Sequence, residues 1–115
     1  MGVPHPIPEQ LAELIADRFR VLAEPVRLRL LDSLRDGEAT VGELAGRLGT
    51  SQQNVSKHLA VLVGAGLVGR ERRGNRVMCH IADMEVFDLC ELVCGGMARQ
   101  IADIQSLLDT PEASS

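Results

Sequence analysis

A run of amide, hydroxyl and ammonium side chains lies near the middle of the chain. Its members are Ser51, Gln52, Gln53, Asn54, Ser56, Lys57 and His58. Glutamine and asparagine amides can form paired hydrogen bonds with adenine, whereas serine and lysine can contact phosphates or guanine. These residue types could therefore read DNA, although their composition alone does not distinguish the segment from an ordinary polar surface helix.

A cluster of arginines follows this segment. It surrounds the dipeptide Gly74-Asn75 and contains a single acid, Glu71. Its members are Arg70, Arg72, Arg73 and Arg76. Four guanidinium groups with a single nearby acid are not expected in a hydrophobic core, but they suit contact with phosphates or with a minor groove. This cluster favours DNA binding over an ordinary polar surface. We predict DNA contacts at Arg72, Arg73, Asn75 and Arg76.

A third group with possible chemistry is a cysteine pair. Cys90 and Cys94 are spaced i, i+4 in a helical pattern, which places their β-carbons roughly 5 to 6 Å apart on one face. Thiolates bind soft ions such as cadmium, lead, arsenite or zinc, and Cys79 is a possible further ligand. Two alternatives stay open: a redox pair that responds to oxidants or reactive sulfur, or two small apolar fillers. The isolated His5, His58 and His80 are not expected to bind metal.

The elements that must position these residues follow from the apolar spacing. Helical periodicity predicts helices at 9–22, after Pro25, after Thr40, after Ser51 and from Asp83 onward. Thr40 and Glu43 form a capping box, Gly49 ends the short helix, and Ser51 caps the next one. The last pattern is interrupted by Gly95-Gly96, which either admits another backbone or marks a kink.

The period changes to that of strands around the arginines. Residues 67–81 predict two short strands joined by a tight turn at Gly74-Asn75. Two short helices joined at Gly49-Thr50 and followed by this basic hairpin predict a mainly α fold with a β-hairpin wing, a winged helix-turn-helix. We expect about five helices and two strands.

Length and composition limit the alternatives. With 115 residues, 45% apolar and 24% charged, the chain suits one compact domain and is not a disordered sequence. An odd cysteine count and the lack of a signal segment favour a cytoplasmic protein without a disulfide scaffold. We expect a proline-rich leader at 1–8, the winged helix-turn-helix domain with dimerising terminal helices at 9–109, and a frayed tail at 110–115.

The charge is segregated along the chain. The net charge is −4, but residues 40–82 carry six Lys and Arg against two acids, a net charge of +4. The flanking segments 1–39 and 83–115 are acidic. Because phosphate binding responds to the local patch rather than to the total, the acidic average does not argue against DNA.

Several motifs together resemble one known family, the ArsR/SmtB bacterial transcriptional repressors. The similar segments are Phe19–Leu28, Val41–Ala45, Ser51–Leu59 and Ala65–Val68, within a match that runs from about Leu11 to Ile81. The resemblance implies a homodimer packed through its first and last helices. It also implies a pseudo-palindromic double-stranded operator that is released when an inducer binds, with no membrane contact.

The inducer sites that this family uses are incomplete here. The arsenic-type site needs cysteines in the third helix, and Thr40–Leu44 has none. The zinc-type site on the last helix would fall on Asp83, Glu85, Gly96 and Arg99. Glycine has no ligand atom and Arg99 would repel a metal, so Cys90 and Cys94 are the remaining candidates for an inducer site.

Two other classes of function are alternatives to a repressor. No glycine-rich phosphate loop, metalloprotease motif or serine elbow occurs, so an enzyme is not expected. The stronger rival is a winged-helix module that binds proteins and responds to no inducer. Such a module would show no salt-dependent DNA binding, and its arginine hairpin would have no role.

Overall fold

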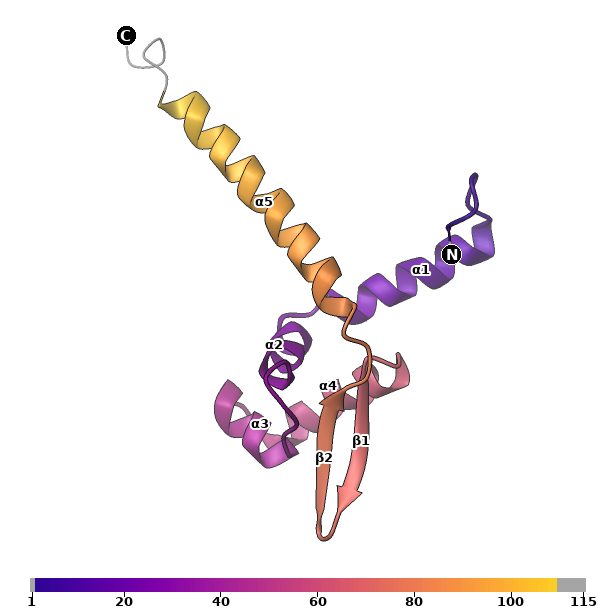
Figure 1. Ribbon diagram of the computed structural model, residues 1–115, viewed down its shortest axis with the longest axis vertical. Helices are drawn as coiled ribbons and strands as arrows, with labels where there is room; N and C mark the ends of the chain where they lie inside the picture. The colour runs from indigo at the N-terminus through magenta and orange to yellow at the C-terminus, as the bar shows by residue number, and fades with distance from the viewer. Residues whose placement is uncertain (1, 110–115) are drawn as a thin grey trace. The chain divides into compact units, whose positions relative to one another are not determined.

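The structure, a computed structural model, describes residues 2–109. Its elements are α1 (Glu9–Leu22), α2 (Pro25–Leu34), α3 (Val41–Leu48), α4 (Gln52–Gly64), β1 (Val68–Arg73), β2 (Arg76–Ile81) and α5 (Val86–Leu108) (Figure 1). The prediction of five helices with a hairpin before the last is confirmed, and the fold is a winged helix-turn-helix. The predicted leader contains no helix over 2–8, and the predicted tail at 110–115 lies outside the described residues.

The chain forms two compact units, Met1–Asp83 and Met84–Ser115. In the first unit, the helix ends are fixed by the side chains that the sequence predicts. Thr40 Oγ1 accepts a hydrogen bond from the Glu43 N–H at 3.1 Å, and the Glu43 carboxylate accepts one from the Thr40 N–H at 3.2 Å. Gly49 ends α3 at a φ of +69°, in the left-handed region that favours glycine. Ser51 Oγ then caps α4 by accepting the Asn54 N–H at 3.1 Å.

The helix-turn-helix is held by an aliphatic core. Leu30, Leu44, Val55 and Leu62 are completely buried, so α2, α3 and α4 contribute to one interior. Burying a side chain of this size stabilises the fold by about 1.5–3 kcal/mol. This packing determines which face of α4 remains exposed.

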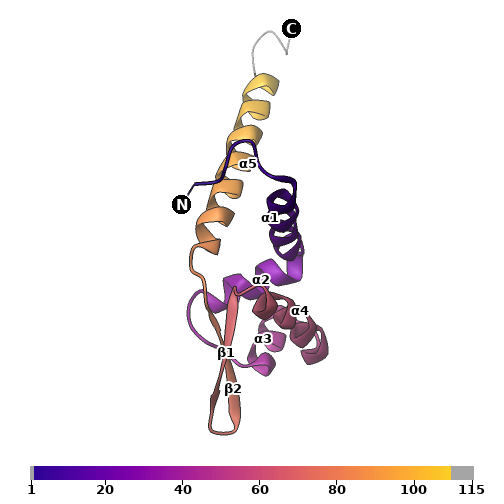
Figure 2. The same cartoon turned by 90° about the vertical axis from the view of Figure 1, so that its right-hand side faces the viewer.

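The wing is a two-stranded antiparallel hairpin whose ends pair Val68 with Ile81 and Arg73 with Arg76. Its two-residue turn begins at Gly74, whose φ of +63° a side chain would strain. The other edge of β2 pairs with the loop before α3, because Ala39 and Cys79 exchange two backbone hydrogen bonds of 3.0 and 2.8 Å. Figure 2 shows the tip of the hairpin extending past α3 and α4.

The second unit consists of α5. The helix begins at Val86 rather than at Asp83, and it continues without a break through Gly95 and Gly96. The glycine pair therefore does not end the helix, and its two readings, a kink or the close approach of another backbone, stay predictions. The unbroken helix carries both Cys90 and Cys94.

Candidate nucleic-acid interface

The first turns of α4 present a polar surface. Ser51, Gln53, Asn54 and Lys57 line one open depression, and Gln52 and Ser56 are exposed beside them. The backbone N–H groups at this helix start also favour negative charge. The structure thus brings together six of the seven residues that the sequence singles out in this segment.

Not all of these side chains are equally available for a ligand. The Asn54 amide is half-buried, and its Nδ2 donates to Thr50 Oγ1 at 3.1 Å. Gln52 lies against the start of α3, because a β-carbon added at Gly42 would be 3.5 Å from Gln52 Nε2. Gln53 and Lys57 are exposed and have no side-chain hydrogen bond or ion pair among the described residues, so they extend most freely from α4.

His58 does not belong to this polar surface. It is 8% exposed and its Nδ1 lies 3.2 Å from Arg27 Nη1, so it faces the interior rather than the solvent. We therefore remove His58 from the predicted set of DNA contacts. His58 directly follows Lys57 in the polar run, so the sequence analysis grouped the two residues. Consecutive helical positions differ by about 100° around the axis, and the two side chains therefore point in different directions.

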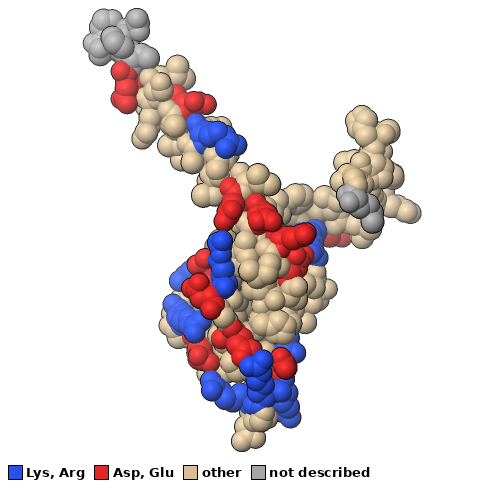
Figure 3. Space-filling view, viewed as in Figure 1, with Lys and Arg blue, Asp and Glu red and all other residues tan. Residues whose placement is uncertain are grey.

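The wing carries the predicted cationic side chains. Arg70, Arg72, Arg73, Asn75 and Arg76 are all exposed. Lysine and arginine gather around this end of the first unit, with acids between them (Figure 3). Arg72 makes no ion pair within residues 2–109, so its charge is available to an external anion.

Two wing arginines form ion pairs with acidic side chains, and the sequence did not predict these pairs. Arg73 forms ion pairs with Glu38 and with Glu71, the latter at 3.3 Å. Arg76 Nη2 donates to Glu43 Oε1 at 3.0 Å. Spacing gives no signal for contacts between residues more than thirty positions apart. These contacts fasten the wing to α3 and to the loop before it.

Glu43 is the centre of this arrangement. Hydrogen bonds from the Thr40 backbone and hydroxyl lower the pKa of its carboxyl, and the charges of Arg76 and Arg47 lower it further. The same carboxylate that caps α3 therefore also accepts from the wing. One charged group joins the helix-turn-helix to the hairpin.

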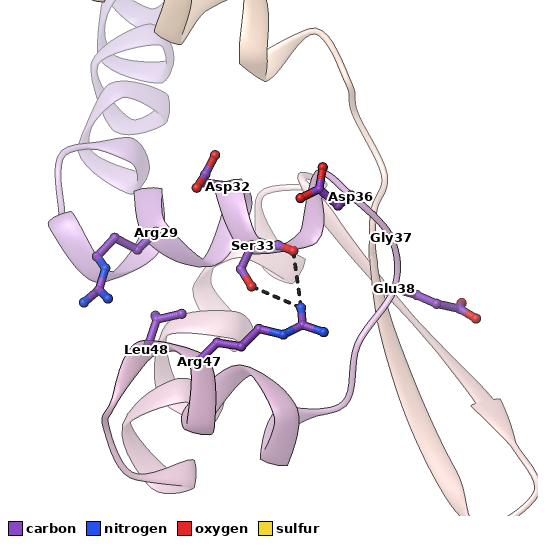
Figure 4. A pocket seen from close by; sticks show the side chains of 8 residues that line it. All are labelled: Arg29, Asp32, Ser33, Asp36, Gly37, Glu38, Arg47 and Leu48. Atoms are coloured by element: carbon purple, nitrogen blue, oxygen red, sulfur yellow. Dashed lines mark hydrogen bonds between the residues drawn. The ribbon is translucent and has the colours of Figure 1, made fainter.

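A larger depression of about 500 Å³ lies between α2 and α3. Figure 4 shows Arg47 reaching across it to Ser33, whose hydroxyl and carbonyl accept from Arg47 Nη1 at 3.2 and 3.5 Å. Acids line the same depression at Asp32, Asp36 and Glu38. This mixture of charges does not suit a phosphate, so the polar face of α4 and the wing remain the candidate interface.

The cysteines lie in two different environments. Cys79 is completely buried in the first unit, and burial raises the pKa of its thiol although Arg70 opposes the shift. Burial disfavours an accessible thiolate at Cys79, and a role for Cys79 as a further metal ligand stays a prediction. On α5, Cys90 is half-buried and Cys94 is exposed. No group of three or more potential metal ligands occurs within 2–109, so one chain alone does not supply a complete thiolate site.

Comparison with known proteins agrees with this architecture. A helix-turn-helix domain family matches residues 22–70. The HTH-type transcriptional regulator Rv0081 of Mycobacterium tuberculosis (strain ATCC 25618 / H37Rv) is 34% identical over 102 residues, which cover 88% of this chain and 90% of that protein. The transcriptional repressor SmtB of the same strain is 38% identical over 80 residues, 70% of this chain and 59% of its own length.

Solved structures give the same result. The homodimeric winged helix-turn-helix domain Mb0332 of Mycobacterium bovis, described as a possible ArsR-family regulator, has a TM-score of 0.67 at 31% identity. The match covers 90% of this chain and 91% of that one. The chain belongs to the ArsR/SmtB family.

Membership of the ArsR/SmtB family assigns the class of activity. The protein is a DNA-binding transcriptional regulator of the repressor type and not an enzyme, as its family and relatives show. No helix in the described part of the chain is long and apolar enough to cross a membrane. For this ArsR/SmtB protein, the exposed polar start of α4 and the basic wing form the candidate interface.

Proposed function

We propose that the protein is a homodimeric repressor that binds a pseudo-palindromic DNA operator. In this proposal α4 enters the major groove, where Gln53 and Lys57 contact bases or nearby phosphates. The wing lies along the backbone with Arg72 toward phosphate. The observation that carries the proposal is the combination of an exposed amide and ammonium surface on α4 with an unpaired arginine on the adjoining hairpin.

The apolar face of α5 supports the homodimer. Seven of its large apolar side chains are more than half exposed, and five of these lie along one side of the helix: Val93, Met97, Ile101, Ile104 and Leu108. Their spacing of three or four residues forms one stripe along the helix. A two-fold pairing would cover the stripe on both chains with a single self-complementary interface. The relative Mb0332 is itself described as homodimeric.

The inducer of this repressor is proposed to be a soft metal or metalloid. Cys90 and Cys94 flank Val93 within the apolar stripe, so a paired α5 could bring four thiols together. Cadmium, lead, arsenite and zinc all accept thiolate ligands. Two relatives are described as a probable mercury resistance operon repressor and as an antimony-specific repressor.

An oxidant or reactive sulfur species is the second candidate inducer. A redox response needs two thiols close together, and Cys90 and Cys94 lie about one helical turn apart on α5. One similar solved structure is that of reduced HlyU from Vibrio cholerae. In this case the thiols would change covalently and no metal would be bound.

Salt-dependent DNA binding tests the repressor against a protein-interaction module. Affinity for a labelled duplex should fall by orders of magnitude between about 50 and 200 mM salt, because phosphate contacts release counterions. Fluorescence anisotropy at several salt concentrations measures this slope. An affinity that does not change with salt would contradict the assignment of the wing to phosphate.

A panel of inducers tests the role of the cysteines. Soft metals, arsenite and a disulfide-forming oxidant are added separately to the protein–operator complex, with magnesium as the hard-ion control. The double variant Cys90→Ser, Cys94→Ser should bind DNA normally and fail to respond, whereas Cys79→Ala should respond like the wild type. Reversal by chelator identifies metal capture, and reversal by reductant identifies oxidation. A double variant that still responds would exclude this cysteine pair.

A further inference from the structure

One buried histidine on α4 is not explained by DNA contact. Among residues 2–109, His58 is the one buried residue whose side chain carries a nitrogen or oxygen atom. Burying an imidazole costs free energy unless its nitrogens find partners, and an apolar residue would fill the same space without that cost. The partners of His58 therefore indicate what the residue does.

The partner of the His58 ring is a guanidinium that already binds another helix. Arg27 Nε donates to the Val21 carbonyl at 2.5 Å, and Arg27 Nη2 donates to the Arg20 carbonyl at 3.2 Å. Both carbonyls lie in the last turn of α1, where the helix dipole favours a positive charge. The remaining nitrogen, Nη1, lies 3.2 Å from His58 Nδ1. One side chain thus connects the end of α1 to the middle of α4.

Glu24 completes the connection from the start of α2. Its Oε2 accepts the Arg27 N–H at 3.0 Å and lies 3.7 Å from His58 Nδ1. In the tautomer that carries its proton on Nε2, His58 Nδ1 accepts a hydrogen bond from Arg27 Nη1. The carboxylate fixes the backbone of Arg27, and the guanidinium fixes the ring.

The position of His58 on α4 determines what this network controls. Gln53 lies about 140° around the helix axis from His58, at 3.6 residues per turn. Holding His58 against Arg27 therefore fixes the direction in which Gln53 and Lys57 point. We infer that Arg27 and Glu24 are positioning residues that set the rotation of α4 about its axis through His58, and thereby set base discrimination.

This inference rests on the proposed function and makes a selective prediction. Base contacts depend on the rotation of α4, whereas phosphate contacts from the wing do not involve this network. Loss of the network should lower affinity for the operator and leave affinity for random duplex nearly unchanged. A role in stability alone would lower both affinities by the same factor, because only the folded fraction binds.

The test measures both affinities for variants at each side of the contact. The operator is the sequence that the wild type enriches from a random pool. His58→Leu should lower operator affinity about tenfold and change random-duplex affinity by less than about twofold. His58→Asn, whose amide oxygen can accept from Arg27, should restore most of the loss. Arg27→Lys, which keeps the charge but loses the planar fork, should behave like His58→Leu.

Leu62→Val is the matched control, because Leu62 is buried on the same helix and has no polar side-chain atom that could hydrogen-bond with the network. It should lower the melting temperature and keep the ratio of the two affinities. The inference is overturned if His58→Leu and Arg27→Lys leave the ratio unchanged, or if Leu62→Val lowers it equally. A wild type that binds random duplex but enriches no sequence would contradict the proposed function itself, and the inference would fall with it.

Discussion

The arginines of the wing differ in the side chains that they contact. Arg72 has no ion-pair partner within residues 2–109, whereas Glu38 and Glu71 hold Arg73. We expect Arg72→Ala to weaken binding to every sequence alike and to reduce the salt slope by about one.

Glu38→Gln should strengthen non-specific binding, because it removes a negative charge and releases Arg73. Anisotropy titrations across salt concentrations measure both effects, and an unchanged slope for Arg72→Ala would argue against phosphate contact there.

Gln53 tests base readout at the same scale. Its side chain is exposed on α4 and makes no hydrogen bond within the described chain. Gln53→Ala should reduce discrimination at one operator position by about 1–3 kcal/mol and leave the salt slope intact. Binding to a set of operators that each carry one base change measures this discrimination. Equal losses at every position would show that Gln53 does not read a base.

Some single-residue roles could not be predicted from the sequence. The polar run on α4 and the wing arginines were found from residue type and spacing. The burial of His58 and the pairing of Arg76 with Glu43 depend on packing between elements far apart in the chain, and spacing carries no information about that. His58 was placed among the DNA contacts for this reason.

Between elements, the capping carboxylate of α3 couples fold stability to pH. The pKa of Glu43 is lowered, chiefly by its hydrogen bonds with Thr40, so the folded state favours the charged form. The resulting stabilisation is present above about pH 4.5 and is lost as the pH falls through the lowered pKa. Glu43→Gln should therefore melt below the wild type near neutral pH, and the difference should shrink in acid. A difference that does not change with pH would contradict this coupling.

The hairpin depends on one close approach between its strands. A β-carbon at Gly69 would lie 2.5 Å from His80 Nε2, so Gly69→Ala requires the imidazole ring to move. We expect this variant to lose about 1 kcal/mol of unfolding free energy, as in other overpacked sites. The double variant Gly69→Ala, His80→Ala should lose less than the two single changes added together. Additive losses in chemical denaturation would rule out this contact as the cause.

The elements themselves were largely predictable, because local chemistry determines where they begin and end. The Thr40 capping box, the left-handed Gly49, the Ser51 cap and the turn at Gly74 all appear where the sequence indicates. The start of α5 and its continuity through Gly95 and Gly96 were not predicted. Glycine only weakens a helix by about 1 kcal/mol relative to alanine, so favourable neighbours can carry the helix across the pair.

For the whole molecule, charge segregation and an exposed apolar helix support the proposed DNA-binding homodimer. The basic region 40–82 contains α3, α4 and the wing, whereas the acidic region 83–115 contains the proposed dimer helix. Because the charges are separated in this way, the acidic residues of α5 lie outside the basic region that we propose binds DNA. The central claim is that two such basic regions bind one symmetric site.

Selection of bound duplexes from a random pool tests this claim most directly. A homodimeric repressor should enrich a site with two-fold symmetry, whose half-sites are centred about one DNA turn apart, roughly 34 to 36 Å. Two chains should bind each site, and the affinity should fall steeply with salt. Enrichment of an asymmetric sequence, binding by a single chain, or affinity that is indifferent to salt would contradict it.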